Sequence, residues 1–234
     1  MNKVQKYKPS DKMVDLISDN YVLLQVMSRF GLSLGFGEKT VKEVCEMNHV
    51  HCPTFLAVVH FVEEGYSRID DGDEDISIPA LVDYLHQAHI YFLDFCLPDI
   101  RRKLIYAIDY SGDDVSFLIL KFFDEYMNEV RRHMEYEEKT VFKYVDALLK
   151  SHPRKNYQIS TFSKHHDSIS EKLTEFKNII IKYCPPKANK NALNSVLFDI
   201  YTCEQGLDSH CKIEDYLFVP AILKLERRIS GNEK

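Results

Sequence analysis

The amino-acid sequence predicts an all-α protein in which an up-down-up-down four-helix bundle follows a small helical domain. Apolar residues recur with a helical period along most of the 234-residue chain, and the alternation typical of strands is scarce. Glycines and prolines fall between the periodic segments. Four of these segments are long and are separated by short breaks, which indicates antiparallel neighbours in a bundle.

The small helical domain is expected within residues 1–70. One helix is predicted over residues 12–30, and it should end at Gly31. A second helix should begin after Thr40, because Thr40 and Glu43 have the spacing of a capping box. These two helices supply part of a core that is separate from the bundle.

A third helix is predicted after Pro53, ending at Gly65. The acidic run that follows is interpreted as a solvated linker over residues 71–78. A calcium loop is excluded by spacing, because Gly72 comes too early and no glutamate closes the loop at the required distance.

Four long helices are expected within residues 79–230, and together they form the bundle. Their predicted ranges are 79–108, 114–150, 157–183 and 192–229.

Each long helix carries one histidine on its apolar stripe, and two of them also carry a glutamate one turn later. These six side chains are His89, His133, Glu137, His166, His210 and Glu214. A single histidine on such a stripe is commonly a core residue bonded to a carbonyl group. A buried ionised carboxylate is costly unless it is paired or bound to metal, so the two glutamates favour a metal site. His165, about 100° away from His166, should face solvent.

The depth of these residues along their helices supports the same interpretation. His89 and His166 each lie about ten residues from a helix start, or roughly 15 Å along the axis. Glu137 and Glu214 lie about twelve and fourteen residues from a helix end, which in an up-down bundle is the same depth. All six side chains are therefore predicted to share one layer.

The chemistry of the ligands indicates the metal. Imidazoles and carboxylates without a thiolate suit iron, with manganese as the alternative, and six side chains exceed the needs of one tetrahedral zinc. We expect two iron ions with an oxo or hydroxo bridge, joined by Glu137 and Glu214. The Glu-x-x-His order of ferritin-like sites is absent from these positions.

The pattern resembles the hemerythrin-like domain of the iron-sulfur cluster repair di-iron proteins, the repair-of-iron-centres family. The resemblance implies a non-haem di-iron centre held by four histidines and two bridging glutamates. Oxygen-carrying hemerythrins instead use a second histidine one turn after the third-helix ligand, where this chain has Ser170. The matching positions are His133 with Glu137, His166 followed by Asp167, and His210 with Glu214.

The stretch "FGLSLGFGEKTVKEVC" resembles that family's small ScdA-type N-terminal domain. The family has adjacent cysteines where this chain has Gly35 and Phe36, and only Cys45 is retained. The first-helix ligand also departs from the pattern. His89 is favoured because it is centred on the apolar stripe, and His86, one turn earlier, is the alternative.

Composition narrows the range of functions. A net charge of -6 without a polybasic segment argues against nucleic acid or a membrane surface as partner. The N-terminus lacks the apolar stretch of a signal peptide, and six separated cysteines favour a reduced cytoplasm.

The resemblance implies a role in nitrosative and oxidative stress, with damaged iron-sulfur proteins as partners. The alternatives are a sensor or carrier that binds O2 or NO reversibly, and an enzyme that reduces NO or peroxide at the same centre. The sequence does not separate these functions, and it assigns no catalytic residue.

Overall fold

The computed structural model describes residues 6–63, 75–108, 114–150, 157–164, 167–184 and 188–231. Within these ranges the protein is helical, and the sole pairing of extended backbone is a β-bridge between Lys12 and Thr40. The predicted all-α class is therefore confirmed. The chain divides into two compact units, residues 89–211 and residues 1–88 with 212–234, and both boundaries fall inside continuous helices.

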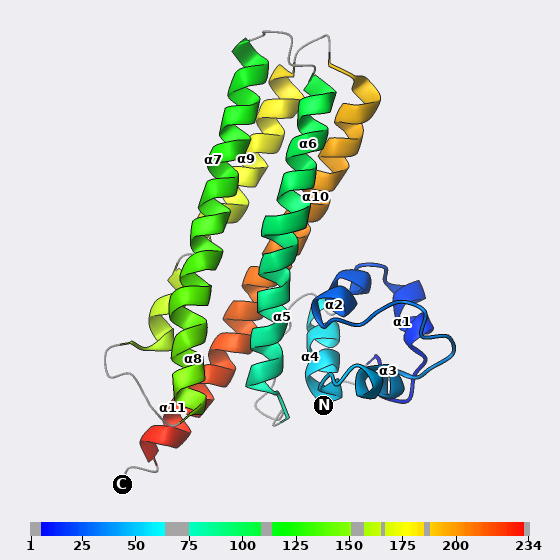
Figure 1. The fold of residues 1–234 in the computed structure, drawn as a ribbon, viewed down its shortest axis with the longest axis vertical. Coiled ribbons are helices and arrows are strands. Elements are labelled where there is room, and N and C mark those ends of the chain that lie inside the picture. Colours follow the sequence, from blue (N-terminus) through cyan, green and yellow to red (C-terminus); the bar gives the residue numbers. More distant parts are fainter. Residues whose placement is uncertain are drawn as a thin grey trace. The chain divides into compact units, whose positions relative to one another are not determined.

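The unit of residues 89–211 is built from long helices that run side by side (Figure 1). Two of these helices contain a short π-helical segment, and a separate 3₁₀ segment precedes the third. The elements are η1 (Tyr91–Cys96), α6 (Leu97–Ile108), α7 (Asp114–Tyr136), η2 (Glu137–Val141), α8 (Phe142–Leu149), η3 (Ile159–Lys164), α9 (Asp167–Tyr183) and α10 (Lys190–Ile213).

Salt bridges link the four helices of this unit in a closed cycle from α6 to α7, α9, α10 and back to α6. Most of the paired side chains are partly exposed, so each pair contributes little to stability. Their arrangement nevertheless identifies the neighbours of every helix, and it matches the order expected of an up-down-up-down bundle. The pairs are Arg101–Asp124, Lys172–Glu129, Lys177–Glu204 and Lys103–Asp199.

The other unit contains the N-terminal helices and the ends of two long helices. Its core includes Phe55 and Tyr84, and the half-buried ring of Phe30 packs 5.5 Å from the first and 4.8 Å from the second. Arg29 is buried beside them and donates a hydrogen bond to the Tyr84 hydroxyl. The elements are α1 (Met13–Asp19), α2 (Leu23–Arg29), α3 (Val41–Met47), α4 (Cys52–Glu63), α5 (Ile78–Ile90), η4 (Glu214–Phe218) and α11 (Val219–Gly231).

The prediction of one helix over residues 12–30 was wrong, because Asn20 interrupts it. Asn20 has an extended backbone (φ -148°, ψ 101°), and its side-chain oxygen accepts from the N–H of Val22 at 3.0 Å. Its amide donates to Glu63 at 2.7 Å. An asparagine that bonds locally in this way competes with the helical backbone, and here two helices result.

Two other N-terminal predictions match the structure. Gly31 ends α2 with φ 71°, and the capping box of Thr40 and Glu43 is formed. Gly65 and the first half of the predicted linker, residues 71–74, lie outside the described residues, and α5 already begins at Ile78.

The third long helix also differs from its prediction. Its first part is the 3₁₀ segment η3, and the α-helix starts at Asp167. The hydroxyl and N–H of Thr161 both bond to the carbonyl of Gln158, at 2.8 and 3.1 Å. This local hydroxyl bonding favours the tighter turn.

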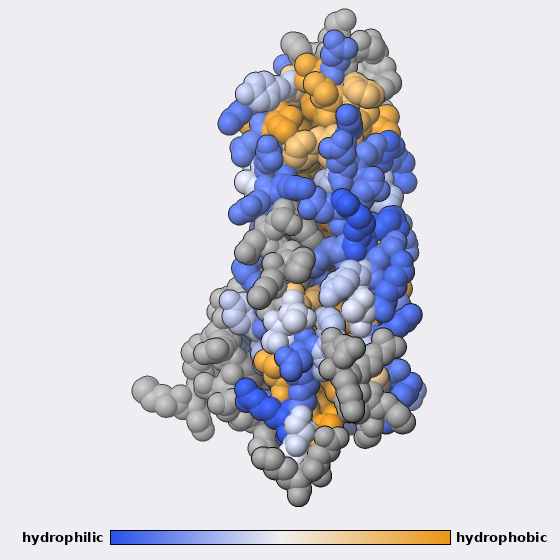
Figure 2. Space-filling view, turned by 90° about the vertical axis from the view of Figure 1, so that its left-hand side faces the viewer, coloured by the Kyte–Doolittle hydropathy of each residue, from blue (hydrophilic) through white to orange (hydrophobic). Residues whose placement is uncertain are grey.

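Figure 2 shows a mostly hydrophilic face on which apolar side chains gather near one end. In the described part of the chain, no helix is both long and apolar enough to cross a membrane.

Candidate metal centre

The chain has two His-x-x-x-Glu motifs, His133 to Glu137 and His210 to Glu214, and the glutamate of each repeated motif begins a π-helical turn. Glu137 is the first residue of η2, and Glu214 is the first residue of η4. A third π-segment, η1, starts two residues after His89. Such turns occur frequently at functional sites, where they change the direction of side chains within a continuous helix. The sequence analysis did not predict them.

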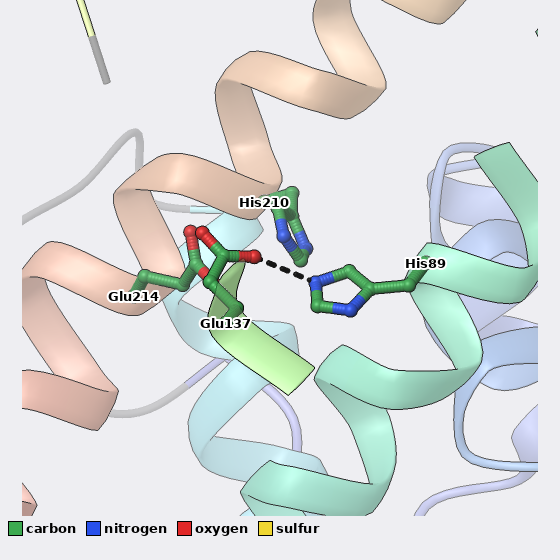
Figure 3. Close-up of side chains that lie close together, drawn as sticks. All are labelled: His89, Glu137, His210 and Glu214. Atoms are coloured by element: carbon green, nitrogen blue, oxygen red, sulfur yellow. Dashed lines mark ion pairs between the residues drawn. The ribbon is translucent and has the colours of Figure 1, made fainter. Parts of the chain in front are cut away.

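Glu137 lies at the centre of the cluster. It has no exposed surface, and its two oxygens approach two different histidines. Its Oε2 lies 2.9 Å from His89 Nε2, as drawn in Figure 3, and its Oε1 lies 2.8 Å from His133 Nε2. His89 Nε2 and both Glu137 oxygens make no well-oriented hydrogen bond. These atoms therefore converge without an aligned donor, as expected of ligands that surround a metal position.

His89 has a second carboxylate on its other nitrogen. It is 3% exposed, and its Nδ1 lies 2.7 Å from Oε1 of Glu138. An ionised carboxylate only accepts, so Nδ1 donates, and a neutral imidazole then directs the Nε2 lone pair into the cluster. This carboxylate–histidine arrangement commonly orients metal ligands. His86, by contrast, is exposed on the same helix.

Electrostatics couple these groups. Burial alone would lower the pKa of His89, but the carboxylates of Glu137 and Glu138 outweigh it and raise that pKa above its usual value. Burial alone would raise the pKa of Glu137, but His133 and His89 outweigh it and hold that pKa well below its usual range. The Glu137 carboxylate is therefore ionised at neutral pH and is suited to bind a cation.

Aromatic rings surround the histidines. The His89 ring stacks on Phe142 with centroids 5.5 Å apart, and it meets His210 edge-on at 5.1 Å. His210 is fully buried, and its ring centroid lies 6.1 Å from that of Phe92. These apolar walls reduce the local dielectric constant, which strengthens the attraction between the carboxylates and a bound cation.

Two sets of potential ligand atoms share Glu214. The atoms of His89, Glu137, His210 and Glu214 all lie within 4.8 Å of one another (Figure 3). A second set with the same spacing consists of His133, Cys211 and Glu214. The oxygens of Glu137 approach a histidine of each set. Each of the two sets could hold a metal ion.

The structure brings together five of the six predicted ligands. The sixth, His166, lies outside the described residues, as does His165. Sequence reasoning expected Glu138, about 100° round the helix from Glu137, to face water or to support a ligand, and it did not consider Cys211. Cys211 precedes Glu214 by three residues, a spacing that places both on one helix face and could have indicated it.

An antiparallel helical bundle with a buried cluster of histidines and glutamates defines a class of metal-binding proteins. The family model of the Hemerythrin HHE cation binding domain matches residues 80–222, and the chain belongs to this family. No curated protein matches the chain significantly.

Proposed function

We propose that the cluster is a dinuclear non-haem iron centre in which Glu137 and Glu214 each join the two metal positions. The observation that carries this proposal is the placement of Glu137, whose two oxygens reach His89 and His133 separately. Glu214 supports it by belonging to both sets of ligand atoms. His166 would complete the four histidines.

The protein residues would prepare this centre for a small ligand. Glu138 fixes the tautomer and orientation of His89, and Phe92 and Phe142 limit the access of water to the histidines. When bound, iron would supply redox chemistry and an open coordination position for O2, NO or peroxide.

The biological role that we propose is cytoplasmic, in the nitrosative and oxidative stress response, where the protein helps to restore damaged iron-sulfur centres. The two His-x-x-x-Glu motifs and the N-terminal segment support it by resemblance to the iron-sulfur cluster repair family. Damaged iron-sulfur proteins would be its partners.

The N-terminal loop favours a second candidate, a sensor or carrier that binds O2 or NO reversibly. Gly35 has a φ of 92°, a conformation in which a cysteine would be strained. This loop is therefore suited to glycine, and Phe36 occupies the other position where the repair family has its paired thiols. A carrier would not need those thiols.

Two measurements test the function. Elemental analysis should give about two irons per chain, since each bridging carboxylate serves two metals. A single zinc, or no metal in the folded protein, would contradict the di-iron proposal. Mixing the reduced protein with NO, O2 or peroxide, and separately with an apo-cluster protein, then distinguishes the roles. Reversible spectral changes with NO or O2 favour a carrier, and continuous consumption of NO or peroxide favours an enzyme. Transfer of iron to the apo-cluster protein favours repair.

A further inference from the structure

Cys211 lies within the metal centre although the repeated motif does not include it. It is 7% exposed, and its sulfur lies within 4.8 Å of ligand atoms of His133 and Glu214. His133 and Cys211 come from different helices, α7 and α10, so their proximity results from the fold rather than from sequence spacing.

The helical geometry explains how a thiol and an imidazole both reach Glu214. His210 precedes Glu214 by four residues and Cys211 precedes it by three. In a helix, the residues three and four positions before a given residue lie on the same face as that residue, one on each side of it. The Glu214 carboxylate therefore has an imidazole on one side and a thiol on the other.

We propose that Cys211 Sγ is a ligand of the metal position bounded by His133, Cys211 and Glu214, so that the two positions of the centre are chemically unequal. The proposal rests on the proposed metal centre. On binding, the thiol proton leaves to solvent as the metal–sulfur bond forms, and no electron is transferred. The position near His89 has only nitrogen and oxygen donors, whereas a thiolate makes the other position suitable for softer metals such as cobalt(II) and zinc.

A matched control exists on the same helix. Cys203 is also buried and lies two turns before His210. Among the residues that the structure describes, Cys203 belongs to no set of three converging ligands. A serine at either position replaces sulfur by oxygen with little change in size.

The test is a cobalt(II) titration of the metal-free full-length protein, followed by absorption spectroscopy. We expect a near-ultraviolet sulfur-to-cobalt charge-transfer band in the wild type and in Cys203→Ser. Cys211→Ser should lose the band and bind one of the two cobalt equivalents at least about tenfold more weakly. Circular dichroism checks that both variants fold.

An additional measurement does not depend on any variant. Cobalt-edge X-ray absorption of the wild type should show a sulfur neighbour at about 2.3 Å, the distance typical of metal–thiolate bonds. Two bound cobalt ions without a sulfur neighbour, or a band that persists in Cys211→Ser, would overturn the Cys211 proposal and leave the metal centre intact. A folded protein that binds neither cobalt nor iron would overturn both proposals.

Discussion

Replacing Glu138 by glutamine should weaken the metal centre without emptying it. Glu138 is not one of the converging ligands, but it accepts a hydrogen bond of 2.7 Å from His89. Glutamine keeps the shape and can still accept, so the change removes only the charge. His89 would then be oriented less firmly and would be a weaker donor to metal.

The structure gives the expected size of this effect. A hydrogen bond to a charged group contributes about 1.5–3 kcal/mol and a neutral one about 0.5–1.5 kcal/mol, a difference of roughly 1–1.5 kcal/mol. The Glu138 side chain is 32% exposed, so solvent reduces the difference to about 1 kcal/mol. Because about 1.4 kcal/mol corresponds to a factor of ten, metal affinity should fall roughly fivefold.

Glu137→Gln should cost far more, about a hundredfold or greater, because it alters a fully buried ligand rather than its support. The assay is competition with a chelator, with iron per chain and circular dichroism measured alongside. Glu135→Gln is the control, since the Glu135 side chain is 46% exposed and pairs with Lys139 on the surface. Equal losses from Glu137→Gln and Glu138→Gln would refute the reasoning, and so would iron loss in the Glu135 variant.

Three further predictions concern the ligands, the N-terminal unit and pH. His89→Ala and His166→Ala should reduce the iron content, whereas His86→Ala and His165→Ala should leave it unchanged; equal losses within either pair would disprove the facial assignment. Thr40→Ala should lower the free energy of unfolding by about 1 kcal/mol, measured by urea denaturation, because the capping box is lost. In the metal-free protein the pKa of His89 is raised above its usual value, so protonated His89 stabilises the folded state. This stabilisation is complete below about pH 6.5 and is lost as pH rises through the folded-state pKa of His89. Above about pH 6.5, the melting temperature should therefore fall less steeply with pH in His89→Gln than in the wild type. Melting temperatures that fall equally with pH in the two proteins would contradict this.

The helical period was sufficient to predict the bundle, because long amphipathic helices with short breaks permit few arrangements. It also favoured His89 over His86, since the period of the apolar residues identifies the buried face of the helix and His89 is centred on that face. The interruption at Asn20 was not predicted, because the helical period says nothing of the bond by which its side-chain oxygen accepts from the N–H of Val22. Cys211 was not considered, because its proximity to His133 on another helix depends on how the helices pack.

The π-turns at the metal layer have a consequence for changes in chain length. A π-turn corresponds to one extra residue in an α-helix, and each residue accounts for about 100° of rotation. The helical segments before and after η2 therefore share one axis, but their side chains do not follow a single uninterrupted 100° repeat. The same holds for the segments before and after η4. Deleting one residue within η2 would let α7 and α8 continue as one regular helix, and the side chains beyond the deletion would keep their faces. The layer of glutamates is thus where the bundle accommodates an odd residue, and the same deletion within the regular turns of α7 would instead rotate the side chains on one side of it by about 100°.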